Sequence, residues 1–326
     1  MTTRSIEEVA ASAAANRVKK RLKSIKGETD FILTLTPLDS FARLVYTLEE
    51  LIQEVTFEVV HTESFSGIRC DMTNSSLVCM IKAKFSALVK LPVGVERVKF
   101  TITTSDLKTI FKSAHGQTME ILRMKGEDNL TLSCFGTPLQ EFKLRTLSSD
   151  NESDRLNNIE TDYSLKLSTE EFKNFCRSVS NFGSEVLTIE IRSNASPENS
   201  SDSANKLVTT YTSLKCHTDA NEYSSTYKQK TRMNVEGEIQ FVCDPLHDED
   251  IVPEEIARCN VLYTGEFKVS FIMGFLKNSD KGKVYCALAT MDDGAPGPMI
   301  LHVGLGTENS YMRLVLAPRL EDGEDE

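Results

Sequence analysis

Apolar residues recur at helical spacing in four places along the chain. Within 38–54 they fall at i, i+3, i+4 and i+7, which is the spacing of an amphipathic helix. That group consists of Phe41, Leu44, Val45 and Leu48. Three further groups follow: Leu107, Ile110, Phe111 and Ala114; Phe172, Phe175, Cys176 and Val179; and, less regularly, Phe267, Phe271, Phe275 and Leu276. The pattern predicts four short helices.

Short apolar or alternating runs separate these helices and read as β-strands. They lie at 31–35, 55–60, 97–102, 119–124, 130–134, 140–147, 186–191, 239–243, 261–264, 284–289 and 299–303. Four short helices cannot form a bundle alongside so many strands. The simplest arrangement is an α+β fold in which helices cover one face of antiparallel sheets.

The pattern is also repeated within the chain. Phe41 precedes the strand that starts at Val55 by fourteen residues, and Phe172 precedes the strand at Val186 by the same interval. The two halves meet in a polar stretch without periodicity, which is typical of a linker. We therefore expect an N-terminal extension (1–30), a first domain (31–145), a connector (146–161), a second domain (162–320) and an acidic tail (321–326). A single domain is the alternative.

Two segments of the second half, 194–205 and 244–255, are polar or acidic and indicate loop insertions. The first thirty residues contain a basic block formed by Arg17, Lys19, Lys20, Arg21, Lys23 and Lys26. Such a block is typical of a disordered or frayed helical arm, a nuclear localisation signal or an arm that touches DNA.

Composition narrows the class of protein. Of 326 residues, 40% are hydrophobic, enough for real cores, and no stretch approaches the roughly 20 apolar residues of a membrane span. No apolar signal-peptide region is present in the first thirty residues. The eight cysteines are scattered without a CxxC pair, which favours free thiols in a reducing compartment. A net charge of −11 argues against nucleic acid as a partner unless basic residues gather on one face.

No motif for catalysis, a cofactor or a metal is recognisable. Gly304-Leu-Gly306 lacks a third spaced glycine and a following helix, so it is not a nucleotide-binding fingerprint. The acidic run 247–250 could ligate a metal, but it reads better as a solvated loop. The histidines lie far apart, with no nucleophile context around a serine or cysteine. We therefore expect no enzyme activity, no cofactor and no metal.

The end of the chain is distinctive. The apolar strand that starts at Tyr311 runs into Ala317-Pro318, and proline cannot donate to a ladder, so the strand must stop there. This end resembles the C-terminus of the sliding clamps of the PCNA (proliferating cell nuclear antigen) family. Segments 31–60, 68–78 and 162–177 resemble it too, in the family's order, and the resemblance spans 31–326.

The resemblance implies three subunits of two similar domains each, closed into a homotrimeric ring around duplex DNA. Helices would line the hole and sheets would form the outer wall. The partners would be DNA polymerase, other replication and repair proteins, and a clamp loader. The location would be the nucleus or a viral replication compartment. A ring needs no base contacts, only a positive inner face for phosphates.

The resemblance also implies site residues. Cations on the helices would face DNA, strongest at Lys112, Arg177 and Lys277, whereas Glu49, Glu50 and Glu54 crowd the first helix. The DNA-facing set is Arg43, Lys108, Lys112, Lys173, Arg177, Lys277, Lys281 and Lys283. A pocket for apolar and aromatic partner peptides would comprise Cys70, Asn74, Ser75, Leu77, Leu156, Ile159, Tyr163, Pro298, Met299, Val315, Ala317, Pro318 and Leu320. Subunits would join through an edge strand at 140–147 and another near 223–230.

Three alternatives stay open. One is a subunit of a heteromeric checkpoint-type clamp. Another is a monomeric viral-type processivity factor, whose binding to linear DNA would depend steeply on salt. The third is an enzyme.

Overall fold

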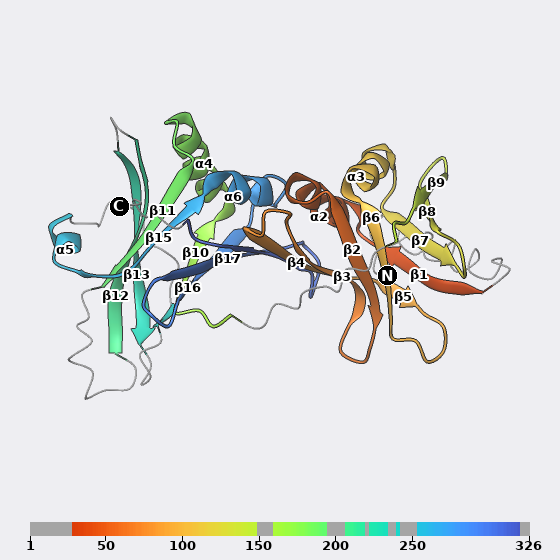
Figure 1. Ribbon diagram of the computed structural model, residues 1–326, viewed down its shortest axis with the longest axis horizontal. Coiled ribbons are helices and arrows are strands. Elements are labelled where there is room, and N and C mark those ends of the chain that lie inside the picture. The colour runs from red at the N-terminus through yellow and green to blue at the C-terminus, as the bar shows by residue number, and fades with distance from the viewer. Residues whose placement is uncertain are drawn as a thin grey trace, which may run out of the picture. The chain divides into compact units, whose positions relative to one another are not determined.

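The computed structural model describes residues 28–148, 159–193, 206–218, 222–233, 239–241 and 253–319. The chain divides into two compact units (Figure 1). Unit 1 comprises residues up to 72, 82–154 and 305–311, and unit 2 comprises 73–81, 155–304 and 312–326. No helix within the described ranges is both long and apolar enough to cross a membrane.

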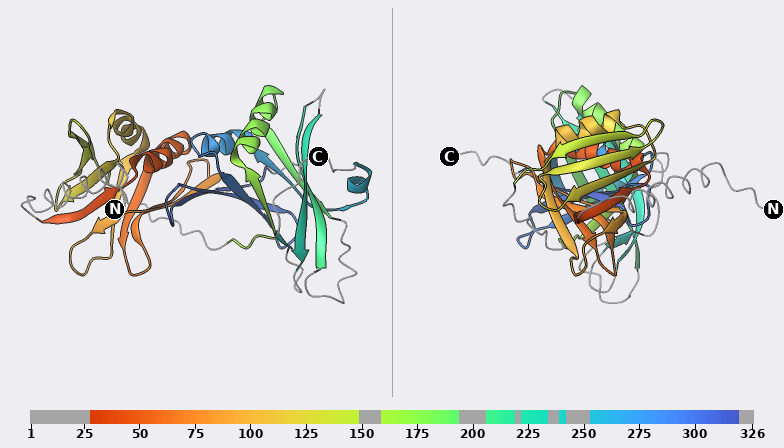
Figure 2. Two further views of the ribbon diagram at one scale, coloured as in Figure 1. Left: turned by 180° about the vertical axis from the view of Figure 1, so that it is seen from behind. Right: turned by 90° about the vertical axis from the view of Figure 1, so that its right-hand side faces the viewer.

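Unit 1 contains a five-stranded sheet, a second row of neighbouring strands that belongs to an eight-stranded sheet, and two helices. One sheet has the order β5 (Leu88–Lys90), β1 (Thr29–Leu35), β7 (Thr118–Met124), β8 (Asn129–Phe135) and β9 (Gln140–Arg145). The other follows the order β4 (Cys79–Ser86), β3 (Ser66–Thr73), β2 (Glu54–His61) and β6 (Arg97–Thr103). Helices α2 (Leu38–Leu51) and α3 (Thr104–Ser113) pack against each other on one side of these sheets (Figures 1 and 2).

The core of unit 1 is built around the ring of Phe41, which is 1% exposed. Its centroid lies 5.1 Å from that of Phe85, 5.4 Å from Phe111 and 6.2 Å from Phe57. These rings come from α2, β4, α3 and β2, so one aromatic cluster joins both helices to the sheet. Aromatic pairs at this spacing stabilise a core beyond the area they bury.

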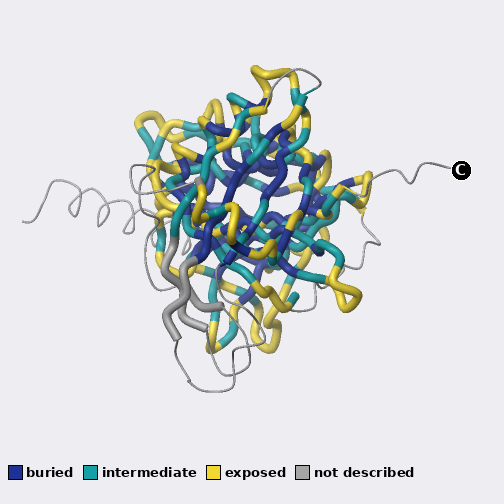
Figure 3. The backbone as a smooth tube through the Cα atoms, turned by 90° about the vertical axis from the view of Figure 1, so that its left-hand side faces the viewer, coloured by how far each residue is buried: buried dark blue, intermediate teal, exposed yellow. Residues whose placement is uncertain are grey.

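Unit 2 repeats the plan with longer strands. One sheet has β10 (Tyr163–Ser168), β16 (Lys283–Thr290), β17 (Pro296–Gly304) and β18 (Tyr311–Leu316) in that order. The other has β14 (Ile239–Phe241), β13 (Glu222–Met233), β12 (Lys206–His217), β11 (Val186–Ser193) and β15 (Asn260–Lys268). Helices α4 (Thr169–Asn181) and α6 (Val269–Leu276) pack together, and α5 (Pro253–Ala257) is a single short turn. The buried residues are dark blue in Figure 3 and lie inside a shell of intermediate and exposed ones.

Backbone hydrogen bonds confirm the internal repeat. In each unit, the first residue of the second long helix donates its N–H to the carbonyl of the residue just before a strand. In unit 1 this bond runs from Thr104 of α3 to Gln53 before β2, and in unit 2 it runs from Val269 of α6 to Glu185 before β11; each is 2.9 Å long. The first helix of each unit makes an equivalent bond. The Leu38 N–H donates to the Gln117 carbonyl in unit 1, and the Thr169 N–H donates to the Gly282 carbonyl in unit 2, again 2.9 Å each. Equivalent donors and acceptors at equivalent places show that the two units share one construction.

Two of the predicted helix boundaries were wrong. The first helix ends at Leu51 and not at 54, because Glu54 already starts β2. The fourth starts at Val269, since Phe267 is a fully buried residue of β15. Lys277 therefore follows α6 as its C-cap.

Candidate functional site

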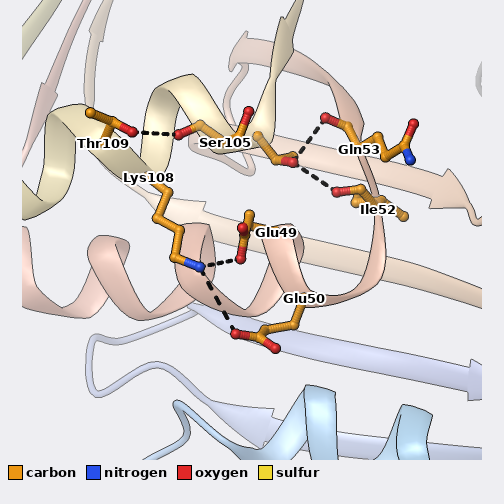
Figure 4. A network of polar contacts seen from close by, with 8 residues as sticks. Glu49, Glu50, Ile52, Gln53, Ser105, Lys108 and Thr109 are labelled. Carbon is orange, nitrogen blue, oxygen red and sulfur yellow. Dashed lines mark hydrogen bonds and ion pairs between the residues drawn. The ribbon is translucent and has the colours of Figure 1, made fainter.

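The cations of unit 1 differ in how far they are neutralised. The Lys108 ammonium on α3 hydrogen-bonds to the Glu49 carboxylate on α2 and lies 4.0 Å from Glu50 (Figure 4). Contact with a phosphate would require Lys108 to leave these two carboxylates. Lys112, one turn further, is exposed and makes no ion pair with any described residue. Arg43 on α2 is half-buried and has polar contacts of its own.

The position of α3 is fixed beside this pair. The Thr104 hydroxyl shares its one proton between the carbonyls of Ile52 (2.7 Å) and Gln53 (2.8 Å), just after the end of α2. Along the exposed side of α3, Thr109 donates to the Ser105 carbonyl at 2.9 Å. The start of α3 is thereby held against α2, and Lys112 is carried on the last turn of a fixed helix.

In unit 2, two cations lie one turn apart on α4. Lys173 donates to the Ser279 carbonyl at 3.0 Å, and exposed Arg177 donates to the Asn174 side chain at 2.9 Å. Burial, and after it the charge of Arg177, lowers the pKa of Lys173. Asp280 and Glu170 act in the opposite direction and raise the pKa of Lys173, so acidic groups also lie near this pair of cations.

The three remaining cations of the predicted set lie beyond α6 and are exposed. Lys277 and Lys283, the latter at the start of β16, both have polar contacts. The Lys281 ammonium, with a side chain 88% exposed, lies 3.9 Å from the Glu170 carboxylate, a pair that solvent screens. The structure thus groups Lys173 and Arg177, and it distinguishes Lys112 from the neutralised Lys108.

Loop 74–78 presents an apolar side chain. The buried Asn74 side chain accepts hydrogen bonds from the N–H groups of Val78 and Cys79, both 3.0 Å, and donates to Ser76. Leu77 has φ 56° and is 78% exposed. A leucine in the left-handed region is costly, and such strain often accompanies a functional role. Asn74 therefore shapes the loop, and Leu77 is what a partner could touch.

The C-terminal segment is fastened next to this loop. The Ala317 N–H donates to the Val78 carbonyl (3.0 Å), and the Arg319 N–H donates to the Glu266 carbonyl (2.7 Å). Ala317 is exposed, while Val315 and Pro318 are half-buried. Pro318 has no N–H, so a partner strand along 317–319 could use only carbonyl acceptors. This limits the predicted strand-like pairing along the tail.

Three predicted pocket residues are buried, which corrects the prediction that their side chains face a peptide. Met299 is 0% exposed, Cys70 is 2% exposed and Asn74 is 7% exposed. Tyr163 is half-buried, and its hydroxyl donates to the Leu262 carbonyl at 3.3 Å. Burial, and then Asp162, raises the pKa of Tyr163.

Other pocket residues vary in accessibility. Ile159 and Pro298 are half-buried and Ser75 is exposed. Leu156, Leu320, the basic block and most of both predicted insertions lie outside the described residues.

The sheets of the described part end at β5, β9, β6, β10, β14 and β15, and the two edges that the sequence analysis named lie on β9 and β13. β9 pairs only with β8. β13 pairs with β12 throughout, but with β14 only at 231–233, which leaves its other edge without a described strand along 222–230. Such edges are ready templates for pairing with another chain.

An aromatic stack beside the β13 edge was missed by the sequence analysis. The Tyr223 ring lies between Phe175 (centroids 5.0 Å apart) and Phe182 (5.3 Å), nearly parallel to both. Phe182, just after α4, is 44% exposed. No local pattern could reveal a stack between residues so far apart in sequence.

Solved structures share this arrangement of helices and strands. The proliferating cellular nuclear antigen from Entamoeba histolytica superposes with a TM-score of 0.63, over 90% of this chain and 100% of that one. The chain has a PCNA-like clamp fold. The PCNA2–PCNA3 complex from Sulfolobus tokodaii matches with a TM-score of 0.59, over 89% of this chain and 100% of that one.

Sequence identity to both clamp structures is only 16%. No protein-family model matches the sequence, and no curated protein sequence does. What this chain shares with the clamps is therefore the order and packing of its elements.

Proposed function

We propose that this protein is a DNA sliding clamp. It acts as a non-enzymatic ring that encircles duplex DNA and tethers polymerase and other replication or repair proteins as a processivity factor. The observation that carries the proposal is the clamp fold, which spans 90% of this chain and the whole of the Entamoeba PCNA chain. Both repeated halves that such a subunit needs are therefore present. The site of action would be the nucleus, or a replication compartment if the protein is viral.

The charge distribution supports this function. The molecule carries a net charge of −11, yet the helices present Lys112, Lys173 and Arg177. A ring held by topology needs only weak phosphate contacts, which carry no sequence information and permit sliding. The acidic remainder of the surface would discourage non-specific adhesion to nucleic acid.

We further propose that three identical subunits close the ring, the open edge of β9 pairing with the open edge of β13 in the next subunit. Three chains of 36.4 kDa would weigh about 109 kDa. Light scattering across a dilution series should show this species. A persistent monomer near 36.4 kDa would contradict the homotrimer.

A heteromeric clamp is the second candidate, and the likeness to a complex of two different PCNA chains favours it. It makes a different prediction in the same dilution series, because a subunit that lacks its partners would stay monomeric alone. Mixing it with a partner clamp subunit would then produce the heavier species.

Leu77 should anchor partner peptides. Peptides selected from a random display library on the full-length protein should bind at least tenfold more weakly to Leu77→Asp, because a central apolar anchor is typically worth about 2 kcal/mol or more. The matched control is Leu88→Asp, since Leu88 is a comparably exposed leucine (76%) in unit 1. Affinities by fluorescence anisotropy should be unchanged in the control. Equal binding by both variants would remove Leu77 from the site.

A further inference from the structure

A polar cavity of about 400 Å³ opens beside the C-terminal segment in unit 2. Its lining includes Glu185 from the turn before β11, Thr188 from β11, His217 at the end of β12, Glu266 from β15 and Arg319 from the tail. Thr188 and Glu266 are directly opposite each other in the β11–β15 register. The neighbouring residues Leu187 and Ile189 are fully buried. The cavity therefore lies on the face of this sheet that points away from the core.

The carboxylates of this cavity form no described ion pair, unlike Glu190 on the same face of the sheet. Glu190 hydrogen-bonds to Arg192 (2.6 Å) and to Lys215 (2.9 Å), so these three groups satisfy one another. Neither Glu185 nor Glu266 forms an ion pair with any described residue. Arg319 is exposed at the rim and pairs with neither of them within the described ranges.

Thr188 provides a second and independent observation. Its side chain is only 8% exposed and lines the cavity, yet its hydroxyl makes no hydrogen bond to any described residue. The hydroxyl is not among the fully buried polar atoms that lack a partner, so it is reachable from the cavity and can bond to a ligand there. The cavity thus combines two carboxylates with an unused hydroxyl, all of which can accept a hydrogen bond.

A lysine or arginine side chain suits this set of acceptors. An ammonium or guanidinium group offers several N–H donors, and bonds from a cation to carboxylates are the strong, charge-assisted kind. A metal ion fits less well, because no three His, Cys, Asp or Glu side chains gather as ligands anywhere in the described part. An anion also fits less well, because the two carboxylates of Glu185 and Glu266 outnumber the single guanidinium of Arg319 in the lining.

We propose that this cavity receives a basic side chain of the partner peptides that dock on loop 74–78 and the tail. The inference rests on the proposed clamp function and adds a specificity element to it. The C-terminal segment links loop 74–78 to the cavity. The Ala317 N–H is hydrogen-bonded to the Val78 carbonyl of the loop, and Arg319 lines the cavity. Two residues span at most about 7 Å. The peptide's basic residue should therefore lie within a few positions of the residue that contacts Ala317.

The test begins with random peptide display on the full-length protein. Selected peptides should share a lysine or arginine at a fixed position beside their apolar anchors. Selection on the Glu185→Gln/Glu266→Gln double variant should keep the anchors and lose that preference. Peptides from the wild-type protein that carry anchors without a basic residue would overturn the proposal.

Affinities of one selected peptide then give the magnitude. Replacing its basic residue with glutamine, or substituting Glu185 and Glu266 together, should weaken binding roughly tenfold, as expected for a lost charge-assisted bond. Both changes combined should cost little more than either alone, because they remove the same contact. Arg319→Gln should strengthen binding slightly, since it removes a like charge from the rim.

Glu254→Gln is the matched control, because Glu254 is an exposed glutamate of α5 that does not line the cavity. It should leave the affinity unchanged. If Leu77→Asp abolishes binding while the two glutamate substitutions have no effect, the cavity assignment fails and the clamp function stands. If no peptide depends on Leu77, the peptide-docking part of the clamp function fails, and this inference fails with it.

Discussion

We expect Lys143→Pro to convert the assembled protein into monomers. Lys143 lies in the middle of the edge strand β9, and its side chain is exposed. The bond from the Thr146 N–H to the Asp128 carbonyl, 2.7 Å, sets the phase of the β8–β9 ladder. Bonded pairs alternate along an antiparallel ladder, so the N–H of Lys143 points away from β8. Proline there removes a donor from the open edge and keeps every bond within the subunit.

The effect on assembly should be large, because the same β9–β13 contact occurs at every subunit boundary of a closed ring. An acceptor left without its donor costs about 2 kcal/mol, close to thirtyfold in affinity. Three identical head-to-tail contacts each suffer this loss. Light scattering over a dilution series should show monomers at concentrations where the wild-type protein is a trimer.

Lys143→Ala is the control, since it removes the side chain and keeps the N–H. It should assemble like the wild-type protein. Thermal unfolding should be similar for both variants, because the proline breaks no internal bond. Unchanged trimerisation of the proline variant would show that β9 is not the subunit contact.

The helices were predictable because a helix on a core must place its large apolar side chains at helical spacing. The strands β12 and β13 show where that logic stops. Thr210 and Thr212 of β12 are fully buried, and Tyr211 and Ser213 between and after them are buried as well. A strand that buries threonine and serine shows no apolar alternation, so the hydrophobic pattern alone does not mark it.

The predicted pocket stays a prediction, but burial already separates residues that the prediction grouped by segment. Pro298 and Met299 are adjacent in β17, and successive side chains of a strand point to opposite faces. One is half-buried and the other has no exposed surface. A prediction that carries a whole segment over from a resemblance must therefore include residues of the wrong face.

The DNA-facing set shows a limit of another kind. The polar face of an amphipathic helix identifies its cations, but it does not show which are neutralised. Lys108 and Glu49 come from different helices, and only the packing of α3 on α2 brings them together. Among the cations of α3, the structure therefore directs the test to Lys112.

Reversing Lys112, Arg177 and Lys277 to glutamate should abolish binding to duplex DNA. Lys112 and Arg177 are exposed on the last turn of α3 and on α4, and Lys277 is exposed just after α6. Each phosphate contact contributes about 0.9 to the slope of log affinity against log salt. Losing three contacts per chain should lower that slope by up to about 3 per subunit.

The measurement is fluorescence anisotropy with a short labelled linear duplex over a salt series. Such a duplex has open ends and can thread through a closed ring, so no loader is needed. The wild-type protein should bind weakly and lose affinity as salt rises. The triple variant should show no binding at the lowest salt, while light scattering shows the same assembly.

The matched control reverses Lys90, Arg97 and Arg258 to glutamate. These residues are also exposed, but they lie outside helices α2, α3, α4 and α6. Both triple variants change the net charge by the same amount. Loss of binding in the helix variant alone would locate the DNA on the helix face, because a general effect of net charge would weaken both equally. Equal weakening would mean that the protein attracts DNA through its overall field, and the inner-face assignment would fall.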